Sequence, residues 1–167
     1  RTMHDARRTT HDARCTMHDA PCTMHDAPCT MHDARCTMHD ASILKLDRIC
    51  KKLNLSPADH VLEIGTGWGG FAIYAAQNYG CEITTTTISQ EQYNLAQARI
   101  KKAGLEDKIH LLLKDYRDLE GTFDKIVSIE MIEAVGHQYL PVYFEQCAAL
   151  LKPEGSMVIQ AINHILN

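Results

Sequence analysis

A glycine-rich stretch that follows a short apolar run limits what this chain can fold into more than any other feature. The run 61–64 (Val-Leu-Glu-Ile) is typical of a buried strand, and glycines follow at positions 65, 67, 69 and 70. An apolar helical pattern begins at once with Phe71. Glycine suits such a turn because a Cβ would block the required backbone angles and the close approach of a ligand. A strand, a tight glycine turn and a helix start predict a site for a nucleotide-like cofactor at the carboxyl end of a parallel strand.

Strand-like and helix-like segments alternate from Ser42 onward. Ser42 is expected to cap a helix that Ser56-Pro57 closes, and Ser89 with Gln92 forms a capping-box pattern for a later helix that Gly104 ends. The expected strands are 61–64, 82–88, 108–113, 125–129 and 157–162, and the other expected helices are 71–79 and 138–151. This alternation predicts an α/β fold with a doubly wound, mostly parallel sheet of about five strands.

Residues 1–41 are a low-complexity repeat with a seven-residue period, of the type Cys-Thr-Met-His-Asp-Ala-Arg. No Leu or Ile occupies a core position, and Pro21 and Pro28 would interrupt a helix, so we expect no stable coiled coil. The recurring His and Cys side chains are metal-ligand types, but their spacing matches no established zinc site. We expect the repeat to be disordered, or to be a tandem nucleotide repeat translated by accident, and we treat 42–167 as the domain.

The remaining composition excludes several classes of protein. No apolar run has the length of a membrane span and no signal-peptide pattern is present, so we expect a cytoplasmic protein. Cys50, Cys81 and Cys147 sit in apolar context without paired spacing, which predicts reduced core thiols. The formal charge is −4 with no basic cluster, so nucleic acid is not an expected partner. No metal site is predicted in the domain.

The residues that follow the second expected strand argue against a nicotinamide cofactor. Dinucleotide binders place an acidic residue about twenty positions past the glycines, where it accepts hydrogen bonds from the ribose hydroxyls. Here that strand ends in three threonines, 85–87, and the first acid is Glu91 inside the next helix. The glycine pattern also carries an acid, Glu63, one residue before the end of the first strand. Many strand-to-helix turns are rich in glycine for packing reasons alone, so the pattern by itself is a moderate signal.

Four segments, 61–70, 87–92, 115–119 and 123–137, carry a more specific signal. In this order they resemble the cyclopropane-fatty-acid synthase family, a group of S-adenosylmethionine-dependent enzymes. The group includes mycolic-acid cyclopropane synthases and related fatty-acid methyltransferases. The resemblance runs from about residue 45 to residue 162. It implies a Rossmann-like class I methyltransferase fold and S-adenosylmethionine as the cofactor.

The resemblance also assigns residues to the cofactor. The positions that match the family's cofactor site are Gly65, Thr66, Gly67, Gly69, Thr87, Gln92, Asp115 and Tyr116. The glycine loop would pass beneath the methionine and ribose part, the threonine and glutamine would take over the role of the missing acid at the ribose, and the last two residues would enclose the adenine. The structural alternatives are a packing turn, a strand end with a helix cap, and an exposed turn.

The chemistry that the resemblance implies requires a base. In this family the sulfonium methyl goes to a cis-alkene carbon of an unsaturated phospholipid or fatty acyl chain, and the resulting carbocation loses a proton as the ring closes. Glu133 matches the glutamate that holds a bound bicarbonate acting as that base, and its alternative role is a helix N-terminal carboxylate. Tyr139, Tyr143 and Phe144 follow closely, either as core residues or as walls for the cation. A lipid substrate also implies peripheral contact with the inner face of the membrane.

Three positions depart from the pattern of many relatives. Glu130 stands where many have glycine, and Ala134 and Gln160 stand where many have histidine. These replacements are consistent with a subgroup of the family, or with a methyl-branched product in place of a ring. His137 lies just past the acid and is expected to be a solvated loop residue.

Segments of the family pattern are missing from this chain. The resemblance implies a tyrosine–serine–cysteine segment where the repeat stands, and a further helix, two strands and a lipid-covering insertion after the fifth strand. We therefore expect a fragment that binds the cofactor without turning over lipid. The alternatives are a small-molecule methyltransferase that shares only the cofactor half, and a non-catalytic relative whose repeat binds metal.

Overall fold

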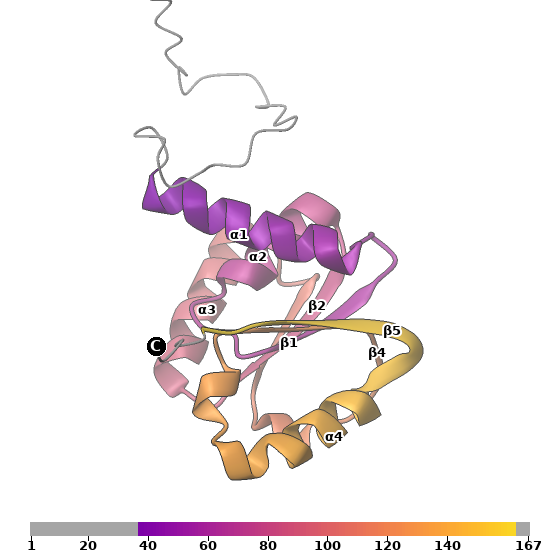
Figure 1. Cartoon of the computed structure of the whole chain (residues 1–167). Coiled ribbons are helices and arrows are strands. Elements are labelled where there is room, and N and C mark those ends of the chain that lie inside the picture. The colour runs from indigo at the N-terminus through magenta and orange to yellow at the C-terminus, as the bar shows by residue number, and fades with distance from the viewer. Residues whose placement is uncertain (1–36, 163–167) are drawn as a thin grey trace, which may run out of the picture.

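A computed structural model describes residues 37–162 of the protein. A five-stranded parallel sheet lies between two layers of helices (Figure 1). The strands are β1 (His60–Ile64), β2 (Glu82–Thr87), β3 (Ile109–Leu113), β4 (Phe123–Ile129) and β5 (Leu151–Gln160). The helices are α1 (Met38–Leu53), α2 (Gly70–Tyr79), α3 (Gln90–Ala103) and α4 (Leu140–Leu150), with short 3-10 turns η1 (Tyr116–Asp118), η2 (Ile132–Ala134) and η3 (His137–Tyr139). The strand order is β3-β2-β1-β4-β5, and every neighbouring pair is parallel. The predicted doubly wound α/β fold is therefore confirmed.

Alternating side chains of the central strands build two separate cores. Val61 and Val127 face the layer that contains α1 and α2, where they pack with Ile49 and Phe71. The neighbouring residues on the same strands point to the opposite face, where Leu62, Ile64 and Ile126 pack against Tyr143 and Leu150 of α4. Both faces of β1 and β4 are buried, as expected for central strands of a parallel sheet.

Helix α1 begins earlier than the sequence predicted. Its N-cap is Thr37, not Ser42, because Thr37 and Asp40 form a capping box. The Asp40 amide donates to Thr37 Oγ1 at 3.1 Å, and the Thr37 amide donates to the Asp40 carboxylate at 2.9 Å. The capping box satisfies two amide donors that the helix start would otherwise leave open. The last residues of the repeat pattern therefore belong to a helix of the folded domain.

Other element boundaries also differ from the expectations. Helix α1 ends at Leu53 and not at Ser56-Pro57, because Asn54 adopts a left-handed conformation with φ 51°. Strand β4 begins at Phe123, which pairs with Leu151 at the start of β5. Strand β5 thus runs over Leu151–Gln160, although residues 157–162 were expected. The expected helix 138–151 divides into η3 and α4.

The three domain cysteines are buried and free, as the sequence predicted. Burial raises the pKa of the Cys81 and Cys147 thiols to about 11, so both are neutral at physiological pH. The predictions for the repeat, including metal binding by its cysteines, concern residues that lie outside the described part. In that part, no helix has both the length and the apolar character needed to cross a membrane.

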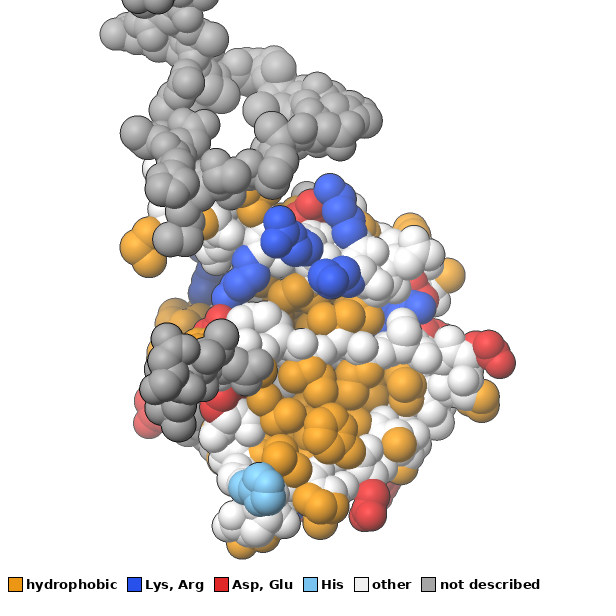
Figure 2. Space-filling view, viewed as in Figure 1, with side chains coloured by type: hydrophobic (Ala, Val, Ile, Leu, Met, Phe, Trp, Pro, Cys, Tyr) orange, Lys and Arg blue, Asp and Glu red, His pale blue; other side chains and the backbone are white. Residues whose placement is uncertain are grey.

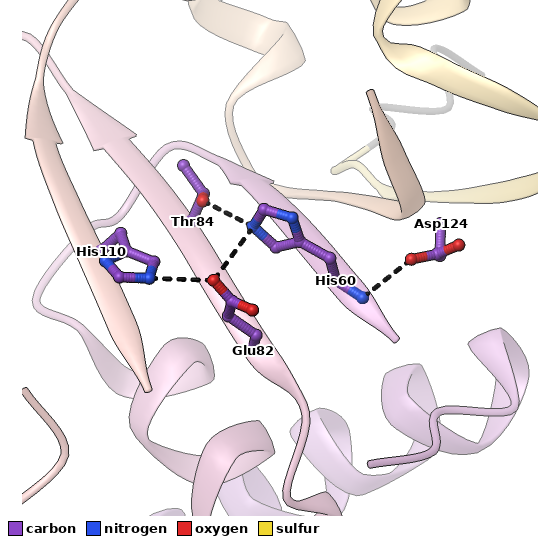
Figure 3. Close-up of polar contacts among 5 residues, drawn as sticks. All are labelled: His60, Glu82, Thr84, His110 and Asp124. Atoms are coloured by element: carbon purple, nitrogen blue, oxygen red, sulfur yellow. Dashed lines mark hydrogen bonds and ion pairs between the residues drawn. The ribbon is translucent and has the colours of Figure 1, made fainter. Parts of the chain in front are cut away.

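Polar side chains at the amino ends of β1, β2 and β3 contact one another through hydrogen bonds and ion pairs (Figure 3). Glu82 Oε1 lies 2.9 Å from His110 Nε2 and 4.0 Å from His60 Nε2, and His60 Nε2 is 2.9 Å from Thr84 Oγ1. The His60 amide donates to Asp124 at 3.0 Å. Within residues 37–162, no group of three or more His, Cys, Asp or Glu side chains is placed to hold a metal ion. The cluster lies at the end of the sheet opposite the carboxyl ends of the strands.

Candidate functional site

A pocket of about 390 Å³ opens at the carboxyl ends of the strands. Its lining residues come from the ends of β1 and β2, the start of α3, the turn after β3 and the segment after β4: Ile64, Gly65, Thr86, Thr87, Ile88, Gln92, Lys114, Asp115, Tyr116, Arg117, Met131, Ala134, Val135 and Tyr139. Five of the eight residues assigned to the cofactor line this one pocket, although they come from three separate segments of the sequence. Its position and size suit a small organic ligand at the carboxyl edge of an open α/β sheet.

Thr87 and Gln92 form a hydrogen-bonded pair on one wall of the pocket. Thr87 Oγ1 donates to Gln92 Oε1 at 2.8 Å and accepts from the Ser89 amide at 3.1 Å. The predicted capping box is therefore only half formed, because Ser89 Oγ accepts from the Gln92 amide while the Gln92 side chain turns to Thr87. This arrangement leaves the Gln92 side-chain amide group as a donor at the place where dinucleotide binders put a carboxylate.

Gly65, Gly67 and Gly69 of the loop differ in what surrounds them. Gly65 has φ +98°, and a Cβ there would lie 3.1 Å from Met131 Cγ. Gly69 has φ +78°, and its Cβ would lie 3.3 Å from Ala96 Cβ on α3. Gly67 has φ +51°, but a Cβ there would meet no heavy atom within 4 Å. Gly65 and Gly69 are needed because a larger residue would crowd Met131 or Ala96, whereas the open space beside Gly67 suits a bound ligand.

Thr66 turns its side chain into the protein and does not line the pocket. Its Oγ1 lies 2.7 Å from Thr85 Oγ1, and Thr85 Oγ1 lies 2.6 Å from Glu63 Oε2, to which it donates. Glu63 is only 2% exposed, and this burial raises its pKa to about 8. The sequence marked Glu63 as part of the glycine pattern, but its burial beneath the loop depends on the β1–β2 register, which pairs Glu63 with Thr85.

Asp115 and Tyr116 follow β3 and close another side of the pocket. Asp115 makes an ion pair with Arg117 at 2.7 Å, and this contact lowers the pKa of the Asp115 carboxyl. The Tyr116 ring lies edge-on to the buried ring of Tyr143, with centroids 5.3 Å apart. Tyr143 is therefore a core residue that supports the pocket wall. Tyr139 is half exposed and lines the pocket, and Phe144 is half exposed on α4.

Glu133 lies on η2 next to the pocket residue Ala134, but is itself exposed and does not line the pocket. Its Oε1 accepts a hydrogen bond from the Ile162 amide at 2.6 Å, just past the end of β5. His137 is exposed on η3. The carboxylate thus stands beside the pocket, between the segments that follow β4 and β5.

An ion pair that the sequence did not indicate joins α1 to the segment after β4. Lys45 Nζ of α1 is 3.0 Å from Oε1 of Glu130, the first residue after β4. Glu130 has φ +52°, the left-handed region in which glycine is favoured, and this explains a glycine preference at that position. Because the two residues are 85 positions apart, only the tertiary structure brings them together.

The described residues fit the cofactor that the sequence predicted. The pocket offers hydroxyl and amide groups at Thr87 and Gln92 and an aromatic ring at Tyr116, and the glycine loop leaves open space beside Gly67. A nucleoside requires such a combination of flat apolar walls and a few hydrogen-bonding groups.

Several known proteins resemble this chain in sequence. A sequence model of the family described as mycolic acid cyclopropane synthetase matches residues 20–167. The chain is 43% identical over 117 residues to a probable fatty acid methyltransferase of Pseudomonas putida, covering 69% of this chain and 29% of that protein. It is 47% identical over 118 residues to the cyclopropane-fatty-acyl-phospholipid synthase of Escherichia coli K12, covering 71% of this chain and 30% of that protein.

Solved structures also resemble the fold. The crystal structure of mycolic acid cyclopropane synthase CmaA1 complexed with SAH and CTAB superposes with a TM-score of 0.70 at 29% identity. That match covers 74% of this chain and 43% of the CmaA1 chain. The chain thus spans less than a third of the length of the two curated relatives above. On the family match and the doubly wound fold together, this chain belongs to the mycolic acid cyclopropane synthetase family.

Proposed function

We propose that this chain is the cofactor-binding part of an S-adenosylmethionine-dependent lipid methyltransferase of the cyclopropane synthase type. The observation that carries the proposal is that Gly65, Thr87, Gln92, Asp115 and Tyr116 line one pocket. These residues were assigned to the cofactor from separate sequence segments. The names of the relatives, a fatty acid methyltransferase and a cyclopropane synthase, support the same chemistry.

The residues of the pocket have separate roles in this proposal. Thr87 and Gln92 hold the ribose hydroxyls, and Tyr116 packs on the adenine. The cofactor supplies an electrophilic methyl group when it is bound. That methyl group would be transferred to an alkene carbon of an unsaturated acyl chain. Apolar residues on the other wall, Met131, Val135 and Tyr139, keep water from the site of transfer.

Glu133 is the proposed catalytic residue. A carbocation on the acyl chain must lose a proton before a cyclopropane ring closes, and a bicarbonate held by the Glu133 carboxylate would accept that proton. Glu133 stands beside the pocket and accepts a hydrogen bond from the Ile162 amide just after β5. Its position supports the role of holding a proton acceptor at the edge of the pocket.

The substrate proposed for the full-length enzyme is an unsaturated phospholipid or fatty acyl chain. Figure 2 shows Lys and Arg side chains over α1 and a broad apolar surface below them. Tyr139, Val142 and Phe144 are 53%, 46% and 47% exposed, which is high for large apolar side chains. The apolar surface in Figure 2 and these exposed side chains each support peripheral contact of a cytoplasmic protein with the inner face of the membrane.

Binding and turnover by the whole chain test the proposal separately. Calorimetry with S-adenosylhomocysteine should show micromolar binding, and NAD should not bind under the same conditions. In a second assay the chain is incubated with vesicles of dioleoylphosphatidylglycerol and methyl-labelled S-adenosylmethionine. We expect no labelled lipid, because the chain spans under a third of its relatives' length. Labelled lipid would contradict the cofactor-binding-fragment part of the proposal, and absence of S-adenosylhomocysteine binding by the folded chain would contradict all of it.

A further inference from the structure

The glycine loop, residues 65–69, is anchored to β2 at its beginning. The Gly65 and Thr66 amides both donate to the Thr86 carbonyl oxygen, at 3.1 Å and 2.9 Å. The Thr66 side chain adds a contact of 2.7 Å between its Oγ1 and Thr85 Oγ1. Because β2 lies between β1 and β3 in the sheet, these bonds give the first two residues of the loop the support of the sheet itself.

The second half of the loop, residues 67–69, has less support from the core. Gly67 and Gly69 have positive φ angles of 51° and 78°, a region that glycine reaches as easily as its other conformations. The Trp68 side chain between them is 54% exposed, so it does not anchor the loop in the core. The peptide unit from Trp68 to Gly69 borders a glycine whose φ is free, so its rotation costs little unless hydrogen bonds prevent it.

Two hydrogen bonds hold this peptide unit, one at each end. The Gly69 amide donates to the Thr66 carbonyl oxygen at 2.9 Å. On the other side, Arg99 Nη1 of α3 donates to the Trp68 carbonyl oxygen at 2.6 Å, a short bond from a cationic donor. Because a peptide unit is planar, the two bonds together fix its orientation. In the described part of the chain, the bond from Arg99 is the one side-chain hydrogen bond made to the second half of the loop.

One face of α3 contacts both the pocket and the loop. Gln92, Ala96 and Arg99 are four and three positions apart, the spacing of side chains on one face of a helix. Gln92 lines the pocket, and a Cβ on Gly69 would lie 3.3 Å from Ala96 Cβ. Arg99 adds the hydrogen bond to the loop. Helix α3 therefore connects the wall of the pocket to the glycine loop.

We propose that Arg99 is a positioning residue for the cofactor, an inference that rests on the proposed function. Its guanidinium group fixes the Trp68–Gly69 peptide unit and so preserves the open space beside Gly67. Arg99 acts through the loop, since its side chain is exposed and does not line the pocket. Without this bond the loop adopts other conformations part of the time, and the apparent affinity falls with the fraction of molecules whose loop can bind the ligand.

Calorimetry with S-adenosylhomocysteine on the whole chain measures the effect of removing the bond. Arg99→Met keeps a long side chain but has no hydrogen-bond donor. It should weaken binding about fivefold, the result expected if the competent loop falls to roughly a fifth of the population. Lys102→Met is the matched control, because Lys102 is an exposed cation nearly one turn further along α3, and it should leave the affinity unchanged. Urea unfolding confirms that each variant is folded.

The fluorescence of Trp68 separates positioning from a direct contact with the ligand. Trp68 is the single tryptophan of the chain, so its emission reports on the loop alone. Time-resolved anisotropy should show more nanosecond motion of Trp68 in the ligand-free Arg99→Met variant than in the native chain. Saturating S-adenosylhomocysteine should remove most of this difference, because the ligand then orders the loop.

Each other outcome also decides. Native affinity in Arg99→Met would overturn the inference, and so would equal weakening by Lys102→Met, which would indicate a general effect of charge. Weaker binding with unchanged Trp68 motion would overturn it as well, because Arg99 would then act on the ligand and not on the loop. If the native chain and Arg99→Met bind equally, the proposed function stands and only this inference fails. If the folded native chain binds no S-adenosylhomocysteine, the proposed function fails and this inference with it.

Discussion

The hydroxyl of Thr85 on β2 donates a 2.6 Å hydrogen bond to the carboxyl group of Glu63 on β1, directly beneath the glycine loop. The carboxyl is buried on all sides, and Thr66 of the loop lies 2.7 Å from the same threonine oxygen. The loop therefore rests on a buried acid whose pKa is raised to about 8 by its removal from water. A titratable carboxyl group is therefore buried beneath the glycine loop.

This acid should make stability depend on pH. Since the pKa of Glu63 rises from 4.5 to about 8 on folding, the folded state binds more protons between these values, and stability falls as pH rises through this range. The slope from this group is roughly 1.4 kcal/mol per pH unit. Urea unfolding of the native chain and of Glu63→Gln at pH 5, 6.5 and 8 should show the native protein losing stability relative to the variant. Parallel profiles would contradict the burial of this carboxyl, and Glu120→Gln, which removes an exposed carboxylate, is the control.

Gln92 should contribute to ligand affinity more than to folding. Gln92→Leu removes the side-chain donor beside Thr87 but keeps the backbone amide that Ser89 caps. Calorimetry should therefore show about tenfold weaker S-adenosylhomocysteine binding, while the urea midpoint stays nearly constant. Gln90→Leu is a matched control, because Gln90 bonds to Asn94 on the exposed side of the same helix. Equal effects of the two substitutions would argue against a ligand contact at Gln92.

Alanine at Gly65 and at Gly67 should have different effects. Gly65→Ala places a Cβ 3.1 Å from Met131 Cγ at φ +98°, so unfolding free energy should fall by about 2 kcal/mol or more. Gly67→Ala faces open space and should lose only about 1 kcal/mol from its positive φ. Combining Gly65→Ala with Met131→Ala should recover part of the loss by relieving the contact. Thermal unfolding of the variants measures the differences, and equal losses for Gly65 and Gly67 would contradict the contact.

The Glu130→Gly variant of the protein should be more stable to unfolding than the Glu130→Ala variant. Both substitutions remove the carboxylate and its ion pair, but only glycine relieves the left-handed conformation at φ +52°. The Glu130→Gly variant should therefore exceed Glu130→Ala by about 1 kcal/mol in unfolding free energy. Urea unfolding at neutral pH provides the comparison. The opposite order would mean that Glu130 is not held in this conformation in solution.

The local sequence predicted the presence of helices and strands better than the residues at which they begin and end. Gly80 and Gly104 end α2 and α3 as expected, because each supplies the left-handed residue that closes a helix. The start of α1 was missed because its capping box, Thr37 with Asp40, lies inside the repeat pattern. The start of β5 was missed because Lys-Pro-Glu-Gly reads as a turn, whereas Leu151 pairs with Phe123 across the sheet.

The sequence by itself determined the order of strands and helices, the glycine turn and the position of a pocket at the carboxyl ends of the strands. These features follow from local patterns, since alternating elements and right-handed crossovers leave few ways to build a parallel sheet. Only the tertiary structure decided which polar groups meet. Strand register buries Glu63 against Thr85, and the packing of α1 on the sheet brings Lys45 to Glu130. Contacts between residues far apart in the chain depend on register and packing, which no local pattern contains.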